Sequence, residues 1–270
     1  MTTLTASLPM YNLPEMAGRN AAFWDGLAQE LRRDGLSDLP EELLFSRPAV
    51  PDAIGSEVLF SQTCGYPLQT IYSGQFQLLG VPTYDAPGCG LASHRAFILV
   101  REDSRFRQLA DLRGAVFALN SLHSNSGMNL PRLLFARIAA GRPFFGAVVE
   151  TGTHPASVER VASGELDAAS IDCLTYVFLQ DYRPAAVASL RILAETPESP
   201  AIPFVTAATT PPTTVAVLRD ALLRIAADPA RRPVLDALRI RTISPADPTA
   251  YARLLAYQRE AAELGYPALA

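Results

Sequence analysis

The residue types best suited to binding an anion are gathered in one short stretch, Ser124-Asn125-Ser126-Gly127. An apolar run at 116–119 precedes it, and an apolar-periodic segment follows from Pro131, a residue tolerated in the first turn of a helix. The order predicts a strand, a loop and a helix N-terminus. Free backbone amides and the positive end of the helix dipole bind anions at such junctions. The two serine hydroxyls would add donors, and glycine would allow close approach. The alternative is that Asn125 or Ser126 only caps the helix.

A second kind of chemistry would need the thiol of Cys64 beside a base, with His94 or His154 and Asp172 as candidates. A thiol hydrolase requires that contact, and no nucleophile-elbow glycine pair surrounds Cys64. A buried structural cysteine is the alternative, and we expect no enzyme. The three cysteines (Cys64, Cys89 and Cys173) are too widely spaced to predict a disulfide framework or a metal motif. We therefore expect no cofactor and no metal.

Strand-like and helix-like patterns alternate along the chain. Strands are predicted at 4–10, 43–46, 58–61, 76–81, 97–100, 116–119, 148–151, 166–171, 190–194 and 204–207. Helices are predicted at 17–33, 108–112, from near Pro131, from Thr153 to Gly164, and at 173–182, 213–227, 231–238 and 249–264. This alternation predicts an α/β fold. A central block with its own strands and helices divides the chain into two lobes, 1–95 plus 200–270 and 96–199, joined by two crossover segments. Ligands of such sheets bind beyond the carboxyl ends of strands, here in the cleft between lobes.

The composition excludes several classes of protein. The 270 residues are 49% hydrophobic and 19% charged, which indicates a globular chain. The formal charge of -4 and the scattered basic residues argue against nucleic-acid binding. No apolar run approaches the length of about 18 residues needed to span a membrane, so no membrane insertion is expected. The first residues have no basic and no apolar region of a signal peptide.

Several motifs occur in an order that resembles a known family. They are LPMY at 8–11, QTCGYP at 62–67, DLRG at 111–114, SNSG at 124–127, GTHPAS at 152–157 and SGELDAASID at 163–172. This order is similar to that of the phosphate, phosphite and phosphonate substrate-binding proteins of ABC transporters, from Leu8 to about Pro203. The resemblance implies the type II periplasmic-binding fold, in which two α/β lobes close on a ligand by a hinge motion.

The resemblance also assigns ligand-binding residues. The loop that grips phosphoryl-type oxygens matches Ser124 to Gly127, with Asn125 in place of the usual threonine. His154 matches the histidine of a second loop, and Asp172 matches a carboxylate that faces the other end of the ligand. Asp172 could instead cap the helix that starts at Cys173. Tyr11 and Tyr66 would line the first lobe. His94 is expected at the surface or hinge, and Arg132 is expected to be solvated.

The function implied is capture of a small phosphonate-, phosphite- or phosphate-like anion between two lobes, for an ABC permease. A monomer is expected. The compartment would be the periplasm if a leader was removed, and the cytoplasm if the N-terminus is native. A cytoplasmic ligand-binding or sensing protein of the same fold is the alternative, besides an enzyme that uses Cys64.

Overall fold

A computed structural model describes residues 3–45, 55 and 57–270 of the chain. These residues form two compact units. Unit 1 is built from Met1–Asp85, Gly90–Ser93 and Pro200–Pro248, and unit 2 from Ala86–Cys89, His94–Ser199 and Thr249–Ala270. Each unit contains one five-stranded sheet with helices packed on it, as the predicted α/β class requires.

Unit 1 has the strand order β1 (Thr5–Ala6), β2 (Val58–Gln62), β11 (Phe204–Ala207), β3 (Phe76–Tyr84) and β12 (Ile240–Ser244). Its helices are α1 (Ala17–Arg33), α2 (Gly65–Gln69), α7 (Pro212–Ala227) and α8 (Arg232–Ala237), with short helical turns at Pro14–Met16, Pro229–Arg231 and Pro248–Tyr251. Aromatic rings fix α1 on the sheet. Phe23 stacks on Phe204 at 5.7 Å and Trp24 stacks on Phe60 at 5.8 Å between ring centroids.

Unit 2 has the strand order β7 (Ala147–Glu150), β6 (Val116–Leu119), β8 (Ala168–Asp172), β5 (Ala96–Arg101) and β9 (Leu190–Glu195). Strands β7, β6 and β8 are parallel, whereas β5 runs antiparallel to β8 and β9. The helices are α3 (Leu130–Ala139), α4 (His154–Ala162), α5 (Cys173–Tyr182), α6 (Pro184–Val187) and α9 (Ala252–Glu263), with helical turns at Leu109–Leu112 and Asn125–Asn129. A separate pair, β4 (Ser93–His94) and β10 (Ser199–Pro200), contains two of the points where the chain passes from one unit to the other.

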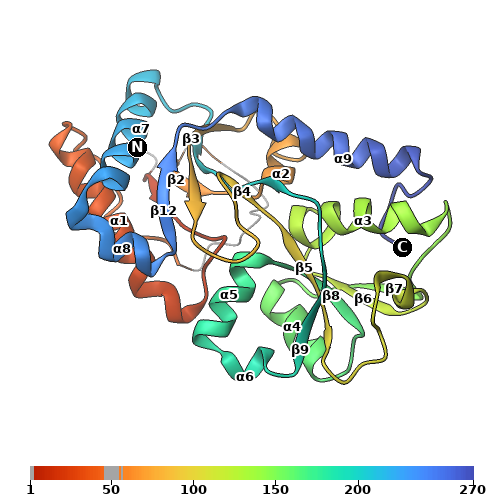
Figure 1. Ribbon diagram of the computed structural model, residues 1–270. Coiled ribbons are helices and arrows are strands. Elements are labelled where there is room, and N and C mark those ends of the chain that lie inside the picture. The colour runs from red at the N-terminus through yellow and green to blue at the C-terminus, as the bar shows by residue number, and fades with distance from the viewer. Residues whose placement is uncertain (1–2, 46–54, 56) are drawn as a thin grey trace. The chain divides into compact units, whose positions relative to one another are not determined.

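The C-terminal segment differs from the sequence-based division. Residues Thr249–Ala270 belong to unit 2, whereas the sequence analysis placed them with the first lobe. In Figure 1, α9 (blue) runs beside α3 (green), and the two helices are in contact. Arg137 of α3 pairs with Glu260 of α9, at 2.8 Å between Nη2 and Oε1. The periodicity of 249–264 predicted a helix, but periodicity does not say which unit a helix covers.

Most predicted elements are confirmed, and the bounds of α1, β6, α5 and β11 agree with the prediction. Strand β12 was missed, because Ile240–Ser244 lies between helices in a stretch interpreted as entirely helical. The strand predicted at 43–46 is wrong for residues 43–45, and residue 46 lies outside the described residues. Within the described part of the chain, every helix is too short or too polar to cross a membrane.

Candidate functional site

Three parallel strands of unit 2 end at one edge of its sheet. Strands β6, β7 and β8 are in parallel register, so the residues that follow them come out on the same side. The loops after β6, β7 and β8 lead into the helical turn at Asn125–Asn129, into α4 and into α5. Three helical N-termini therefore meet the carboxyl edge of the sheet, the usual place for a ligand in an α/β fold.

The loop after β6 is closed by a cap. Ser124 has an extended backbone, and its Oγ accepts the Gly127 N–H at 2.9 Å. Asn125 to Asn129 then form a single π-helical turn that continues into α3. The cap is thus Ser124, and the expectation that Asn125 or Ser126 might serve as the cap is wrong. The Ser126 hydroxyl does not cap the helical turn and can bond another group.

Ser126 meets the histidine of the second loop. Its Oγ lies 3.0 Å from Nε2 of His154, the first residue of α4. Its backbone carbonyl accepts the Ser170 hydroxyl of β8 at 2.6 Å, so the loop is fastened to the central strand. Thr153 caps α4 by accepting the Ala156 N–H at 3.2 Å, as predicted. The structure brings the two predicted residues, Ser126 and His154, into direct contact.

His154 is a neutral hydrogen-bonding group at physiological pH. The pKa of His154 is lowered from 6.5 to about 4, chiefly by burial and also by the charge of His94, while the charge of Asp172 and the backbone of Ser170 act in the opposite direction. Although part of the residue is accessible, its Nδ1 atom is buried. The Nε2 atom, which bonds Ser126, is therefore the nitrogen that faces the loop.

Asp172 is engaged with the protein on both oxygens. Its Oδ1 accepts the Thr175 N–H at 2.9 Å and so caps α5, the alternative that the sequence left open. Its Oδ2 lies 2.8 Å from Nδ1 of His94. Both residues are 2% exposed.

The two groups stabilise each other as an internal ion pair. Burial would raise the pKa of Asp172, but the hydrogen bond and charge of His94 lower it. Burial would lower the pKa of His94, but the hydrogen bond and charge of Asp172 raise it. Of the two places expected for His94, the surface is wrong, whereas the hinge agrees with the passage of the chain from one unit to the other at Ser93 and His94. His94 stands just before β5, and the antiparallel pairing of Ala96 with Asp172 brings it to the end of β8.

A series of hydrogen bonds between buried side chains begins at Asn125 of the loop. Asn125 donates to the Ser199 hydroxyl at 2.9 Å and accepts from Asn129 at 3.1 Å. Asn129 in turn accepts a hydrogen bond of 2.5 Å from the guanidinium of Arg132, which is only 4% exposed. The expectation that Arg132 is solvated is wrong. Its guanidinium also donates to the Pro267 carbonyl at 3.3 Å, so it joins this series to the C-terminal segment.

The other predicted residues lie in unit 1. Tyr11 is buried and packs edge-to-face on Tyr84 at 5.4 Å, and Tyr66 is buried in α2. Cys64 is the N-cap residue of α2 and is 3% exposed, whereas the bases proposed for it belong to unit 2. Roles of Tyr11 and Tyr66 toward a ligand stay predictions. Among the described residues, no group of His, Cys, Asp or Glu is arranged to hold a metal ion.

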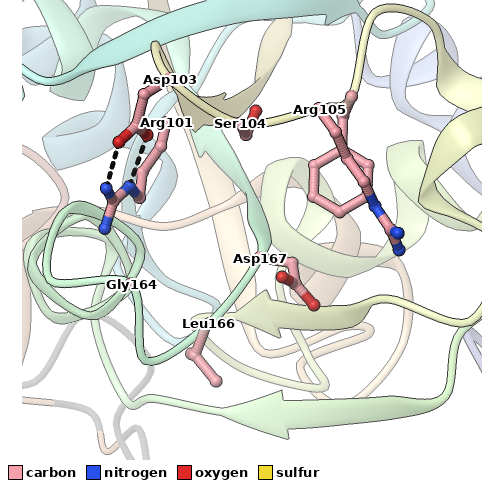
Figure 2. A pocket seen from close by; sticks show the side chains of 8 residues that line it. Arg101, Asp103, Ser104, Arg105, Gly164, Leu166 and Asp167 are labelled. Carbon is pink, nitrogen blue, oxygen red and sulfur yellow. Dashed lines mark hydrogen bonds and ion pairs between the residues drawn. The ribbon is translucent and has the colours of Figure 1, made fainter.

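A pocket of about 400 Å³ elsewhere on unit 2 contains none of these side chains. Figure 2 shows its charged lining, in which the Arg101 guanidinium is bonded to the Asp103 carboxylate, at 2.8 Å from Nε to Oδ1. Asp167 is also occupied, since its Oδ2 accepts the Val116 N–H at 2.8 Å. The remaining charge of the lining, Arg105, lies over the Phe106 ring at 5.5 Å. The edge that carries Ser126 and His154 is the better candidate site, because three helical N-termini meet there.

Comparison with known proteins identifies the family of the chain. The family model of periplasmic phosphonate substrate-binding proteins of ABC transporters matches residues 69–251, more than half of the chain. The matched range includes Ser124 to Gly127, His154 and Asp172, and leaves out Tyr11 and Tyr66. No curated protein sequence matches the chain.

Solved structures share the fold at low identity. XAC2383 from Xanthomonas citri, bound to ATP, has 20% identity and a TM-score of 0.70 over 97% of this chain and 98% of that one. A binding protein component of an ABC phosphonate transporter from Pseudomonas aeruginosa has 14% identity and a TM-score of 0.71 over 97% and 96%. PhnD1 from Prochlorococcus marinus, in complex with methylphosphonate, has 14% identity and a TM-score of 0.69 over 96% and 98%. These likenesses confirm the predicted two-lobed type II periplasmic-binding fold.

Proposed function

Because this chain belongs to the family of periplasmic phosphonate substrate-binding proteins of ABC transporters, we propose that it binds a small phosphonate-, phosphite- or phosphate-like anion at the edge of the unit 2 sheet that carries Ser126 and His154. The family is one of binding proteins and not of enzymes, and it implies a small ligand and a membrane permease as partners. For this chain, a periplasmic location and a monomeric state are part of the proposal.

The observation that carries the proposal is the Ser126–His154 pair at 3.0 Å. It joins a serine hydroxyl and a neutral imidazole at a place where helical N-termini converge. Each hydrogen bond to a charged group contributes about 1.5–3 kcal/mol, so three or four donors account for binding near 1 μM, or about -8 kcal/mol.

Asp172 does not oppose such a ligand. Its negative charge is balanced by His94 at 2.8 Å, so the site carries little net repulsion toward an anion. Direct contact of Asp172 with the ligand stays a prediction. The capture of the ligand between two lobes by hinge closure stays a prediction as well.

The ligands of the relatives indicate which compounds to compare. Methylphosphonate is bound by PhnD1 and ATP by XAC2383, and both compounds present tetrahedral oxyanions. Neutral donors in a short loop recognise that common group, and the size of the site would decide what may be attached to it. We therefore propose the phosphoryl-type group as the part of the ligand that is held by Ser124 to Gly127.

Isothermal titration with methylphosphonate, phosphate and ATP tests the proposal. Wild-type protein should bind at least one of them with a Kd near 1 μM. Ser126→Ala removes a donor and should weaken that binding by about 10–150-fold, equivalent to about 1.5–3 kcal/mol. Ser126 is not the cap, so the loss of unfolding free energy should be limited to about 1 kcal/mol from the broken bond with His154.

Ser124→Ala in the same loop shows what loss of the cap does to stability. It removes the hydrogen bond to the Gly127 amide and should cost about 1 kcal/mol of unfolding free energy. Binding by ATP alone would move the ligand class to nucleotides. Normal binding by Ser126→Ala would remove the loop from the site and overturn the proposal.

A further inference from the structure

Two of the three cysteines meet in unit 2. The Sγ atoms of Cys89 and Cys173 lie 3.5 Å apart, although 84 positions separate the two residues in the chain. Cys173 is the first residue of α5 and is 0% exposed, whereas Cys89 is partly accessible. Cys64, the third cysteine, is buried in unit 1. Two of the three thiols are therefore in contact with each other.

The backbone holds Cys89 against Cys173. Residues Ala86 to Cys89 form a tight turn, in which the Cys89 N–H donates to the Ala86 carbonyl at 3.0 Å. Pro87 stands at the second position, and Gly88 at the third has a φ of 82°, the arrangement of a type II turn. A Cβ on Gly88 would lie 2.7 Å from Cβ of Cys173 and 2.9 Å from the Phe97 ring. Only glycine fits there, so the turn is packed closely on the buried cysteine.

From this geometry we propose that Cys89 and Cys173 are a dithiol–disulfide pair, closed by exchange with a small disulfide such as oxidised glutathione. The Cys89 thiolate attacks one sulfur of glutathione disulfide, the S–S bond breaks, and the first glutathione leaves as a thiolate. The Cys173 sulfur then attacks the Cys89 sulfur and displaces the second glutathione, which takes up the Cys173 proton. One disulfide is reduced for each one formed, and two glutathione thiols are released.

The order of attack follows from the surroundings of each sulfur. The hydrogen bond with Cys89, burial and the nearby Asp172 charge raise the pKa of Cys173, so its thiol stays protonated. The partly accessible Cys89 is the sulfur that an oxidant can reach. A bond across 84 positions removes much conformational freedom from the unfolded chain. It would also hold the start of α5, next to the Asp172 cap.

Thiol counting in the full-length protein tests the inference without any ligand for the anion site. Reduced and glutathione-disulfide-treated samples are unfolded in guanidinium with N-ethylmaleimide, and intact masses are measured. Three adducts are expected on the reduced chain and one on the oxidised chain, with peptide mapping linking residues 89 and 173. The oxidised protein should melt at least about 5 °C higher.

Two variants make the outcome specific. Cys64→Ser should still lose two thiols on oxidation, whereas Cys89→Ser should form no internal disulfide, and its partly accessible position lets it fold. Three adducts on the treated wild-type chain would overturn the inference. A disulfide that includes Cys64 would overturn it as well. None of these results depends on ligand affinity. An outcome that overturns this inference would therefore not contradict the proposed function.

Discussion

His154 and His94 lie at the same edge of the unit 2 sheet, yet their pKa values move in opposite directions. Burial dominates at His154 and lowers its pKa to about 4. At His94 the hydrogen bond and charge of Asp172 outweigh burial and raise the pKa. The difference arises from the partner, because His154 bonds a neutral hydroxyl and His94 bonds a carboxylate. One histidine can therefore contact an anion as a neutral group, while the other neutralises a buried charge.

This difference predicts an acid-sensitive stability. Between pH 6.5 and about 4 the unfolded chain protonates His154 and the folded chain does not, so the free energy of unfolding falls as the pH falls through this range. Since one pKa unit corresponds to 1.36 kcal/mol, the loss from His154 is about 3 kcal/mol. The raised pKa of His94 acts mainly above pH 6.5, where its contribution to the free energy of unfolding is lost as the pH rises. Asp172 has a lowered pKa in the folded protein, so the unfolded chain protonates it first as the pH falls. The free energy of unfolding therefore continues to fall at the acid end of the range.

Denaturant unfolding at a series of pH values measures the effect. His154→Gln keeps a hydrogen-bonding side chain beside Ser126 and should flatten the curve between pH 6.5 and 4. His123 is exposed, so His123→Gln is the matched control and should follow the wild type. Parallel curves for all three proteins would show that His154 does not cause the acid sensitivity.

At the scale of single residues, the sequence predicted the loop and its neighbour but not their supports. Residue types identified Ser126 as a hydrogen-bonding group beside a helix start, the resemblance to the family added His154, and the structure brings the two together. The burial of His94 and Arg132 was not predicted, because it comes from long-range packing. His94 is buried by the pairing of β5 with β8, and Arg132 reaches Pro267 of the C-terminal segment. Neither contact has a local sequence signal.

At the scale of elements, the loop depends on a glycine in the turn before α3. A Cβ on Gly127 would lie 1.9 Å from Oδ1 of Asn120, and this oxygen is buried without a hydrogen-bond partner among the described residues. The close approach brings the turn back onto the end of β6. Glycine was predicted here for access by a ligand, whereas the structure shows that it is also required for packing of the loop on itself.

Gly127→Ala should therefore lower the free energy of unfolding by about 1–3 kcal/mol and weaken anion binding, because the loop must shift to admit the methyl group. Adding Asn120→Ala removes the clash and should restore much of the stability. Gly18→Ala is the control, since nothing lies within 4 Å of the new methyl group in α1, and it should be neutral or stabilising by up to about 1 kcal/mol. An equal loss in both glycine variants would contradict the packing argument.

At the scale of the whole molecule, the two units should open independently, each with segments from distant parts of the chain. Leu254 in α9 is 0% exposed, so Leu254→Ala should destabilise unit 2 by about 2–5 kcal/mol. Hydrogen exchange should then accelerate in α3 and β6 and remain unchanged in α1 and α7. Leu218→Ala in α7 of unit 1 is also at a site with 0% exposure and should give the reverse pattern. Faster exchange in α7 and β12 on substitution of Leu254 would show that the C-terminal helix stabilises unit 1.

The sequence predicted two lobes built from discontinuous segments, but it could not assign the last helix. The central block was recognisable because its strands and helices follow each other closely. Helix α9 has an ordinary amphipathic pattern, and its place is set by particular contacts. Asn129 donates to the Leu254 carbonyl at 3.2 Å, and the Tyr257 hydroxyl donates to the Glu198 carbonyl at 2.7 Å. Contacts of this kind depend on the assembled sheet and have no sequence pattern of their own.

The discontinuity of the units fixes an order of events during translation. Unit 1 cannot be completed before residue 248 has been synthesised, and unit 2 cannot be completed before residue 270. Most of unit 2 emerges from the ribosome earlier, but the contact of α3 with α9 forms only after α9 follows. At about 5–20 residues per second, the 71 residues that follow Ser199 take about 4–14 s to make. For those seconds the unit that carries the proposed site exists as an unfinished nascent chain.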